Sequence, residues 1–167
     1  DYTPQLAQEL GIRVVSFNTE GLFRDDLHRE FKNKDIRNGF KIFGDCDELV
    51  DINEEILQKE IELGTNIFRF AGFDYLENQY KIRNPRMDKS ICWNSDEIKP
   101  NFDFGAHNCR PIALKKEVKW SSKEYELRHN KYQGEDEYVE RCKEYNNRIQ
   151  GWNRQVNHGH ENYLEES

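Results

Sequence analysis

The sequence predicts a mainly α fold: a small helical subunit that is not a regular bundle, with a long irregular middle segment and a heptad-patterned C-terminal helix. Apolar residues recur at helical spacing in the first 63 residues, whereas prolines and glycines break every period between residues 65 and 119. Bulky residues then return at spacings of four and three. We therefore expect a helical domain over 1–80, an extended strap over 81–120 and a helical C-terminal extension over 121–167.

Three helical regions are expected in the first part. Residues 4–15 form the first, because Pro4 suits a first turn and the apolar residues after it share one face. Residues 24–43 form the second. Residues 48–63 form the third, which ends at Gly64, since glycine readily adopts the left-handed conformation that follows many helices. The apolar stripe of this third helix is Leu49, Ile52, Ile56 and Leu63.

The middle of the chain has no clear period. A structureless segment as long as 65–119 is improbable inside a compact domain, so we predict that it lies as a strap across a partner's surface. Ser121-Ser122-Lys123-Glu124 then has the spacing of a capping box, which predicts the start of a helix.

A final helix is expected from Glu135 to about Val156. Its heptad seam consists of Tyr138, Cys142, Tyr145, Ile149, Trp152 and Val156. Bulky aromatic residues in this seam favour packing against an unlike partner, and packing on the chain's own domain is an equal alternative.

The composition suggests a protein that completes its core against partners. Hydrophobic residues make up 35% and charged residues 34% of the chain, against about 45–50% and about 25% in ordinary domains. The 13% of aromatic residues argues against disorder and suits an interface, where aromatic side chains concentrate. A small, independently stable acidic protein is the alternative. The net charge of −7 disfavours a nucleic-acid partner, and no apolar run is long enough to span a membrane.

The common catalytic signatures are missing, so we predict no catalytic residue, cofactor or metal. Cys92, His107 and Cys109 form the one group with ligand chemistry, and Cys142 or His129 could supply a fourth ligand. The spacing is not that of a known zinc site. A small soluble metal-binding enzyme is therefore kept as an alternative, as is a Cys92–Cys109 disulfide in an oxidising compartment.

The segment Phe17-Asn-Thr-Glu-Gly-Leu-Phe-Arg-Asp-Asp26 resembles the signature near the start of the 14 kDa subunit (subunit seven) of respiratory complex III. That family carries an aromatic residue, a Gly-Leu pair and an Asp-Asp pair at this spacing. The matching residues are Phe17, Asn18, Gly21, Leu22, Arg24, Asp25 and Asp26. The resemblance covers about residues 10–80. It departs from the family at Ile67–Tyr75, where the Leu-Pro…Trp element is missing, and in the long C-terminal continuation.

The resemblance implies a non-catalytic structural and assembly subunit of ubiquinol–cytochrome c reductase that supports electron transport. It implies a peripheral position on the matrix side of the mitochondrial inner membrane, with the seven matching residues docking on cytochrome b and the core subunits. The C-terminal extension is then expected to contact other respiratory-complex subunits.

A second mitochondrial family gives the main alternative. The window from Ile36 to Leu63 also resembles the later helices of Leu-Tyr-Arg proteins, which are accessory subunits of complex I or bind acyl carrier protein. The nearest triplet here is Leu22-Phe23-Arg24.

Overall fold

The computed structural model describes residues 3–148 apart from 13, 15–17, 23–24, 35–37, 46, 77–79, 104–106 and 133–134. The helices are α1 (Thr3–Glu9), α2 (Asp25–Lys32), α3 (Glu54–Glu62) and α4 (Glu135–Arg148), with a 3₁₀ turn η1 (Pro85–Met87). The strands are β1 (Phe40–Ile42), β2 (Glu48–Val50), β3 (Ile67–Leu76), β4 (Tyr80–Arg83), β5 (Lys89–Asn94), β6 (Ile98–Lys99), β7 (Ile112–Ala113) and β8 (Trp120–Tyr132).

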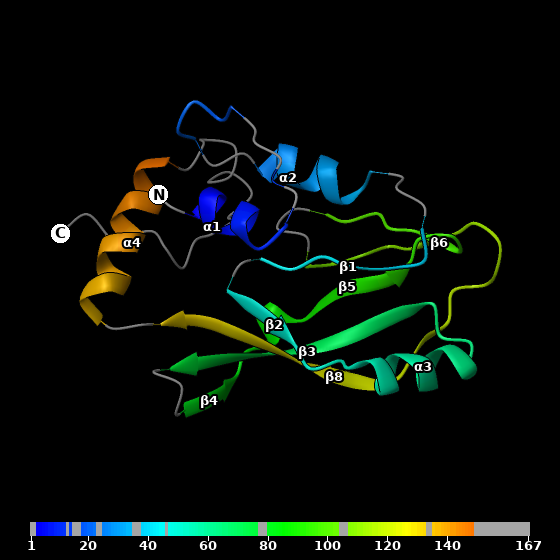
Figure 1. The fold of residues 1–167 in the computed structure, drawn as a ribbon. Coiled ribbons are helices and arrows are strands. Elements are labelled where there is room, and N and C mark those ends of the chain that lie inside the picture. The colour runs from blue at the N-terminus through cyan, green and yellow to red at the C-terminus, as the bar shows by residue number, and fades with distance from the viewer. Residues whose placement is uncertain are drawn as a thin grey trace.

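The prediction of a mainly α fold is wrong, because strands dominate and form a curled, mixed sheet shaped like a half-barrel (Figure 1). The strand order is β1-β5-β3-β8-β2, and β4 also pairs with β3. Strands β3 and β8 are parallel, and the other pairs in this sheet are antiparallel. Figure 1 shows α2 beside β1 and α3 beside β8.

One central strand, β3, was missed because it begins with residues that are buried on both faces. Ile67 and Phe68 are neighbours in β3 and therefore point to opposite faces, yet both are fully buried. Strands of this kind read as continuous apolar runs without the alternation that identifies a half-exposed strand. We call the face that carries Phe68 the inner face and the face that carries Ile67 the outer face.

A separate hydrophobic cluster covers each face. The inner cluster is covered by α3 through Ile56 and Leu57. Its buried members are Phe68, Phe70, Ile91, Cys92, Tyr125 and Leu127. The outer cluster contains Ile67, Trp93, Ile98 and Phe102.

The segment between β5 and β8, expected to cross a partner, crosses the outer face of the chain's own sheet. It forms the small β6–β7 hairpin, and it inserts Ile98 and Phe102 into the outer cluster. Asn33, just after α2, fixes its position: Phe102 N–H donates to Asn33 Oδ1 at 2.7 Å, and Asn33 Nδ2 donates to the Phe102 carbonyl. This crossing segment forms one wall of a pocket on the outer face of the sheet.

Some of the helix ends predicted from local sequence signals are confirmed and others are wrong. Gly64 adopts φ +83° after α3, as predicted, but β2 occupies the start of the region expected as the third helix. The helix predicted from Ser121 is wrong, because this segment is β8. The Ser121 hydroxyl oxygen accepts from the Arg69 N–H across the sheet at 3.0 Å instead of capping a helix.

Candidate functional site

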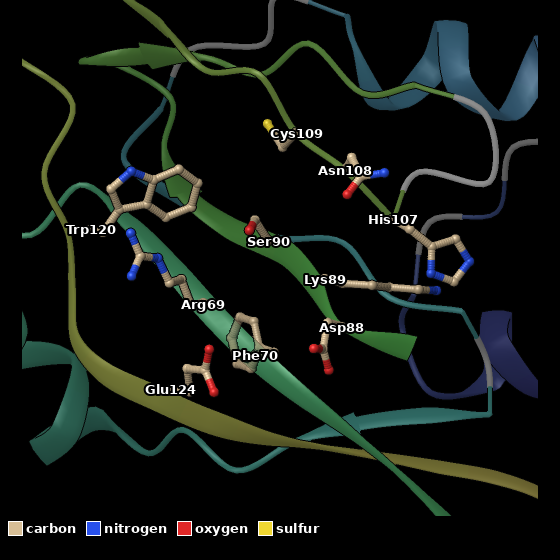
Figure 2. A pocket seen from close by; sticks show the side chains of 10 residues that line it. All are labelled: Arg69, Phe70, Asp88, Lys89, Ser90, His107, Asn108, Cys109, Trp120 and Glu124. Carbon is tan, nitrogen blue, oxygen red and sulfur yellow. The ribbon is translucent and has the colours of Figure 1, made fainter. Parts of the chain in front are cut away.

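A polar pocket with a volume of about 260 Å³ lies between the outer face of the sheet and the crossing segment (Figure 2). The sheet side contributes Arg69, Phe70, Asp88, Lys89, Ser90, Trp120 and Glu124. The crossing segment contributes His107, Asn108 and Cys109. The volume lies just below the roughly 300–1,000 Å³ of sites for drug-sized ligands, so the pocket suits a smaller molecule.

Arg69 is held in the pocket by an aromatic ring. Its guanidinium carbon lies 4.8 Å from the centroid of the Trp120 ring, and Figure 2 shows the side chain extending toward that ring. Stacking of this kind orients the planar guanidinium. Within the described part of the chain, no hydrogen bond or ion pair engages the guanidinium. Its hydrogen-bond donors are therefore available to a ligand.

Glu124 is the register partner of Arg69 on the parallel strand β8, so both side chains stand on the outer face. The two do not form an ion pair, and the Glu124 carboxylate is exposed without a hydrogen bond to any other described residue. A cation and an anion thus stand side by side. Neither forms a direct ion pair with a described residue, although the Glu124 carboxylate also attracts the Arg83 guanidinium through space.

The next carboxylate along the same face is fully engaged. Glu126 accepts from the Tyr75 hydroxyl and pairs with Lys81, and Arg128 Nε lies 3.2 Å from its Oε1. Burial alone would raise the pKa of Glu126, but the hydrogen bonds from Lys81 and Tyr75 outweigh it and lower the pKa. Arg69 and Glu124 therefore differ from their neighbours on the same sheet face.

Asp88 forms a rigid part of the pocket wall. Its Oδ1 accepts from the Gly72 N–H at 2.8 Å, and its Oδ2 accepts from Arg83 Nη2 at 2.8 Å. Burial works against ionisation, but the bonds from Arg83 and Gly72 outweigh it and lower the pKa of Asp88. Because both oxygens accept hydrogen bonds from the protein, Asp88 is held in place as part of the pocket wall.

The metal-ligand group considered from the sequence is not brought together. Cys92 lies in the inner cluster, whereas Cys109 borders the outer cluster and lines the pocket with His107. No group of three His, Cys, Asp or Glu side chains able to hold a metal occurs among the residues that the structure describes. Cys92 and Cys109 are free thiols, and burial raises the pKa of both, that of Cys92 to about 12.

His129 belongs to a separate buried cluster on the inner face. Its Nδ1 lies 2.8 Å from Asp74 Oδ1 and its Nε2 lies 3.5 Å from Asp47 Oδ2. Burial lowers the pKa of His129, but the two carboxylates outweigh it and raise the pKa. Nearby, Lys89 Nζ pairs with Glu48 and Asp45. These charges satisfy one another, so the cluster has the character of a structural network.

None of the expected docking residues that the structure describes lines the pocket. Asn18, Gly21 and Leu22 are exposed before α2, and Arg148 of α4 donates to the Gly21 carbonyl at 2.9 Å. Asp26 is partly buried in α2. Phe17 and Arg24 lie outside the described residues, and the side chain of Asp25 is not among those described.

Of the six residues of the expected heptad seam, the structure describes the side chain of Cys142 alone. Cys142 is 2% exposed and therefore packs against this chain itself. Tyr138 and Tyr145 lie in α4, but their side chains are outside the described set, as are Ile149, Trp152 and Val156 altogether.

Neither a family model nor a curated protein matches this sequence. The mainly α fold expected from the sequence is wrong, and membership of respiratory complex III stays a prediction. In the described part of the chain, no helix is long and apolar enough to cross a membrane.

Of the pocket residues, the sequence singled out His107 and Cys109 as possible metal ligands, but it did not single out Arg69, Trp120 or Glu124. Arg69 stands between Phe68 and Phe70 in an otherwise apolar run. A cation in such a run indicates a position with a specific role on a buried strand. Trp120 was expected at the end of the extended strap and Glu124 in a helix start, so their alignment with Arg69 could not be deduced without the strand pairing.

Proposed function

We propose that this chain is a non-catalytic binding protein whose outer-face pocket recognises a small polar ligand. The observation that carries the proposal is the contrast between the engaged Glu126 and the open pair Arg69 and Glu124 on the same face. Exposed opposite charges on neighbouring strands ordinarily attract each other. Here stacking on Trp120 holds the guanidinium, which leaves both charges ready for a third group.

The chemistry of the pocket supports binding over catalysis. A general base works best with a pKa near the operating pH, and a cysteine nucleophile needs a lowered pKa. The pKa of Asp88 is lowered instead, and that of the Cys109 thiol is raised. Asp88 is thereby stabilised as a carboxylate and Cys109 as a neutral thiol.

We expect ligand-observed NMR to detect at least one binder in a panel of amino acids, sugars, inorganic phosphate and nucleoside monophosphates. Arg69→Ala should weaken its binding by about tenfold or more, because a charge-assisted hydrogen bond is lost. Arg128→Ala is the matched control, since Arg128 is an exposed arginine of the same face outside the pocket. Equal binding by wild type and Arg69→Ala, or no binder at all, would contradict the proposal.

Docking within complex III is the second candidate function. It is favoured by the apolar residues that α1 and its following turn expose: Leu6, Leu10 and Ile12 are 56%, 68% and 56% exposed. An exposed apolar set of this kind suits a contact with another protein. The expected result is a stoichiometric amount of this chain in complex III purified from the source, and its absence from that complex would remove this candidate.

A further inference from the structure

We infer that the ligand of the pocket is a zwitterion of amino-acid size, whose carboxylate binds Arg69 and whose ammonium group binds Glu124. This inference rests on the proposed binding function and adds the chemical class of the ligand.

Arg69 is suited to a carboxylate. A guanidinium presents parallel N–H donors that match the two oxygens of a carboxylate, and pairs of this kind are strong and directional. The guanidinium carbon lies 4.8 Å from the centroid of the Trp120 ring, and this cation–π contact restricts the side chain. Less side-chain freedom is then lost when the ligand binds.

Glu124 supplies the complementary half. An ionised carboxylate only accepts hydrogen bonds, and an ammonium group only donates them. Neighbouring strands lie about 4.8 Å apart, so the side chains of register partners stand close together. In an α-amino acid a single carbon joins the ammonium and the carboxylate, so the molecule carries two opposite charges close together, as Glu124 and Arg69 do on neighbouring strands.

The same pair disfavours singly charged ligands. A simple anion at Arg69 would lie near the Glu124 carboxylate and the ionised Asp88, and a simple cation at Glu124 would lie near Arg69. Like charges brought together in this way select against the wrong ligand. A zwitterion satisfies both charges at once.

The remaining lining can accommodate the rest of such a molecule. Ser90 provides a hydroxyl group and Asn108 an amide, and both face the pocket together with the indole of Trp120 (Figure 2). Neutral polar groups of this type orient a ligand without adding charge.

The test compares free and blocked forms of one amino acid. The twenty common L-amino acids are screened against the full chain by ligand-observed NMR, and the strongest binder is titrated beside its N-acetyl and methyl ester derivatives. We expect each block to weaken binding by about tenfold or more, since each removes one charge-assisted contact.

Two variants test which protein side chain binds which end of the ligand. Glu124→Gln should weaken binding of the free amino acid by about tenfold. Binding of the N-acetyl form should not change, because that form has no ammonium group. Arg69→Ala should weaken the free and N-acetyl forms but not the methyl ester. Equal binding of the free and N-acetyl forms, both dependent on Arg69, would overturn the zwitterion while leaving the binding function intact. Binding of a sugar or phosphate in place of every amino acid would do the same, and no binding by any compound would overturn both.

Discussion

Replacing Gly72 by alanine is expected to destabilise the fold by about 1–3 kcal/mol or more, which is the usual cost of forcing an extra group into a packed site. A Cβ at this position would lie 2.4 Å from Met87 Cβ and 2.6 Å from the Met87 carbonyl carbon. These Met87 atoms cannot simply rotate away, because two of the clashes are with its backbone carbonyl group.

The surrounding hydrogen bonds also resist relaxation. The Gly72 carbonyl accepts from the Asn84 N–H and from Arg83 Nη1, both at 3.0 Å, and the Gly72 N–H donates to Asp88. A shift of η1 away from β3 would therefore break the contacts that hold Asp88 in the pocket wall.

Gly44→Ala is the matched control, because its added Cβ would meet nothing closer than 3.7 Å. Urea unfolding of both variants measures the effect as a change in the free energy of unfolding. A Gly72→Ala protein as stable as Gly44→Ala would contradict the tight contact between β3 and η1.

Replacing Glu60 by glutamine is expected to cost about 3 kcal/mol at pH 7, because buried hydrogen-bond donors lose a charged acceptor. Glu60 lies on α3 and is 1% exposed. Its carboxylate accepts from the Thr65 hydroxyl at 2.6 Å and from the Tyr125 hydroxyl at 2.7 Å. It also accepts from both the N–H and the hydroxyl of Ser122. A glutamine amide would direct an N–H group at some of these donors.

The loss should depend on pH. Burial alone would raise the pKa of Glu60, but the bonds from Ser122, Thr65 and Tyr125 outweigh it and lower the pKa from 4.5 to about 2. The ionised carboxylate therefore stabilises the fold fully above pH 4.5, and this contribution is lost as the pH falls toward 2.

Urea unfolding at pH 7 and pH 3 tests this, with the difference between wild type and Glu60→Gln as the measured quantity. The difference should shrink at the lower pH, and Glu62→Gln, an exposed position near the end of the same helix, should change stability little at either pH. A difference between wild type and Glu60→Gln that is near zero at pH 7 would show that the hydrogen bonds to Glu60 do not stabilise the fold.

The sequence predicted the helices whose signals are local. Gly64 marked the end of α3, and Glu135 marked the start of α4, because turn and cap chemistry depends on nearby residues only. The strands depended on distant residues. The alternation of Tyr125, Leu127 and His129, which are all buried in β8, was present in the sequence, but the capping-box spacing at Ser121 predicted a helix there.

The pocket could not be predicted from spacing along the chain. Arg69 and Glu124 come together because β3 and β8 pair in parallel, and parallel pairing leaves no short turn in the sequence to reveal it. The resemblance over Phe17–Asp26 gave no help with these strands, because it covers a short segment before and at the start of α2.

The central claim, that the outer-face pocket is a binding site, is tested most directly by two-dimensional NMR of the labelled chain titrated with the strongest binder of the panel. We expect the shifted signals to concentrate at Arg69, Ser90, Asn108 and Glu124, with signals on α3 unchanged. Shifts centred instead on the depression lined by Asn53, Glu54, Glu55 and Gln58 would place binding elsewhere and contradict the account.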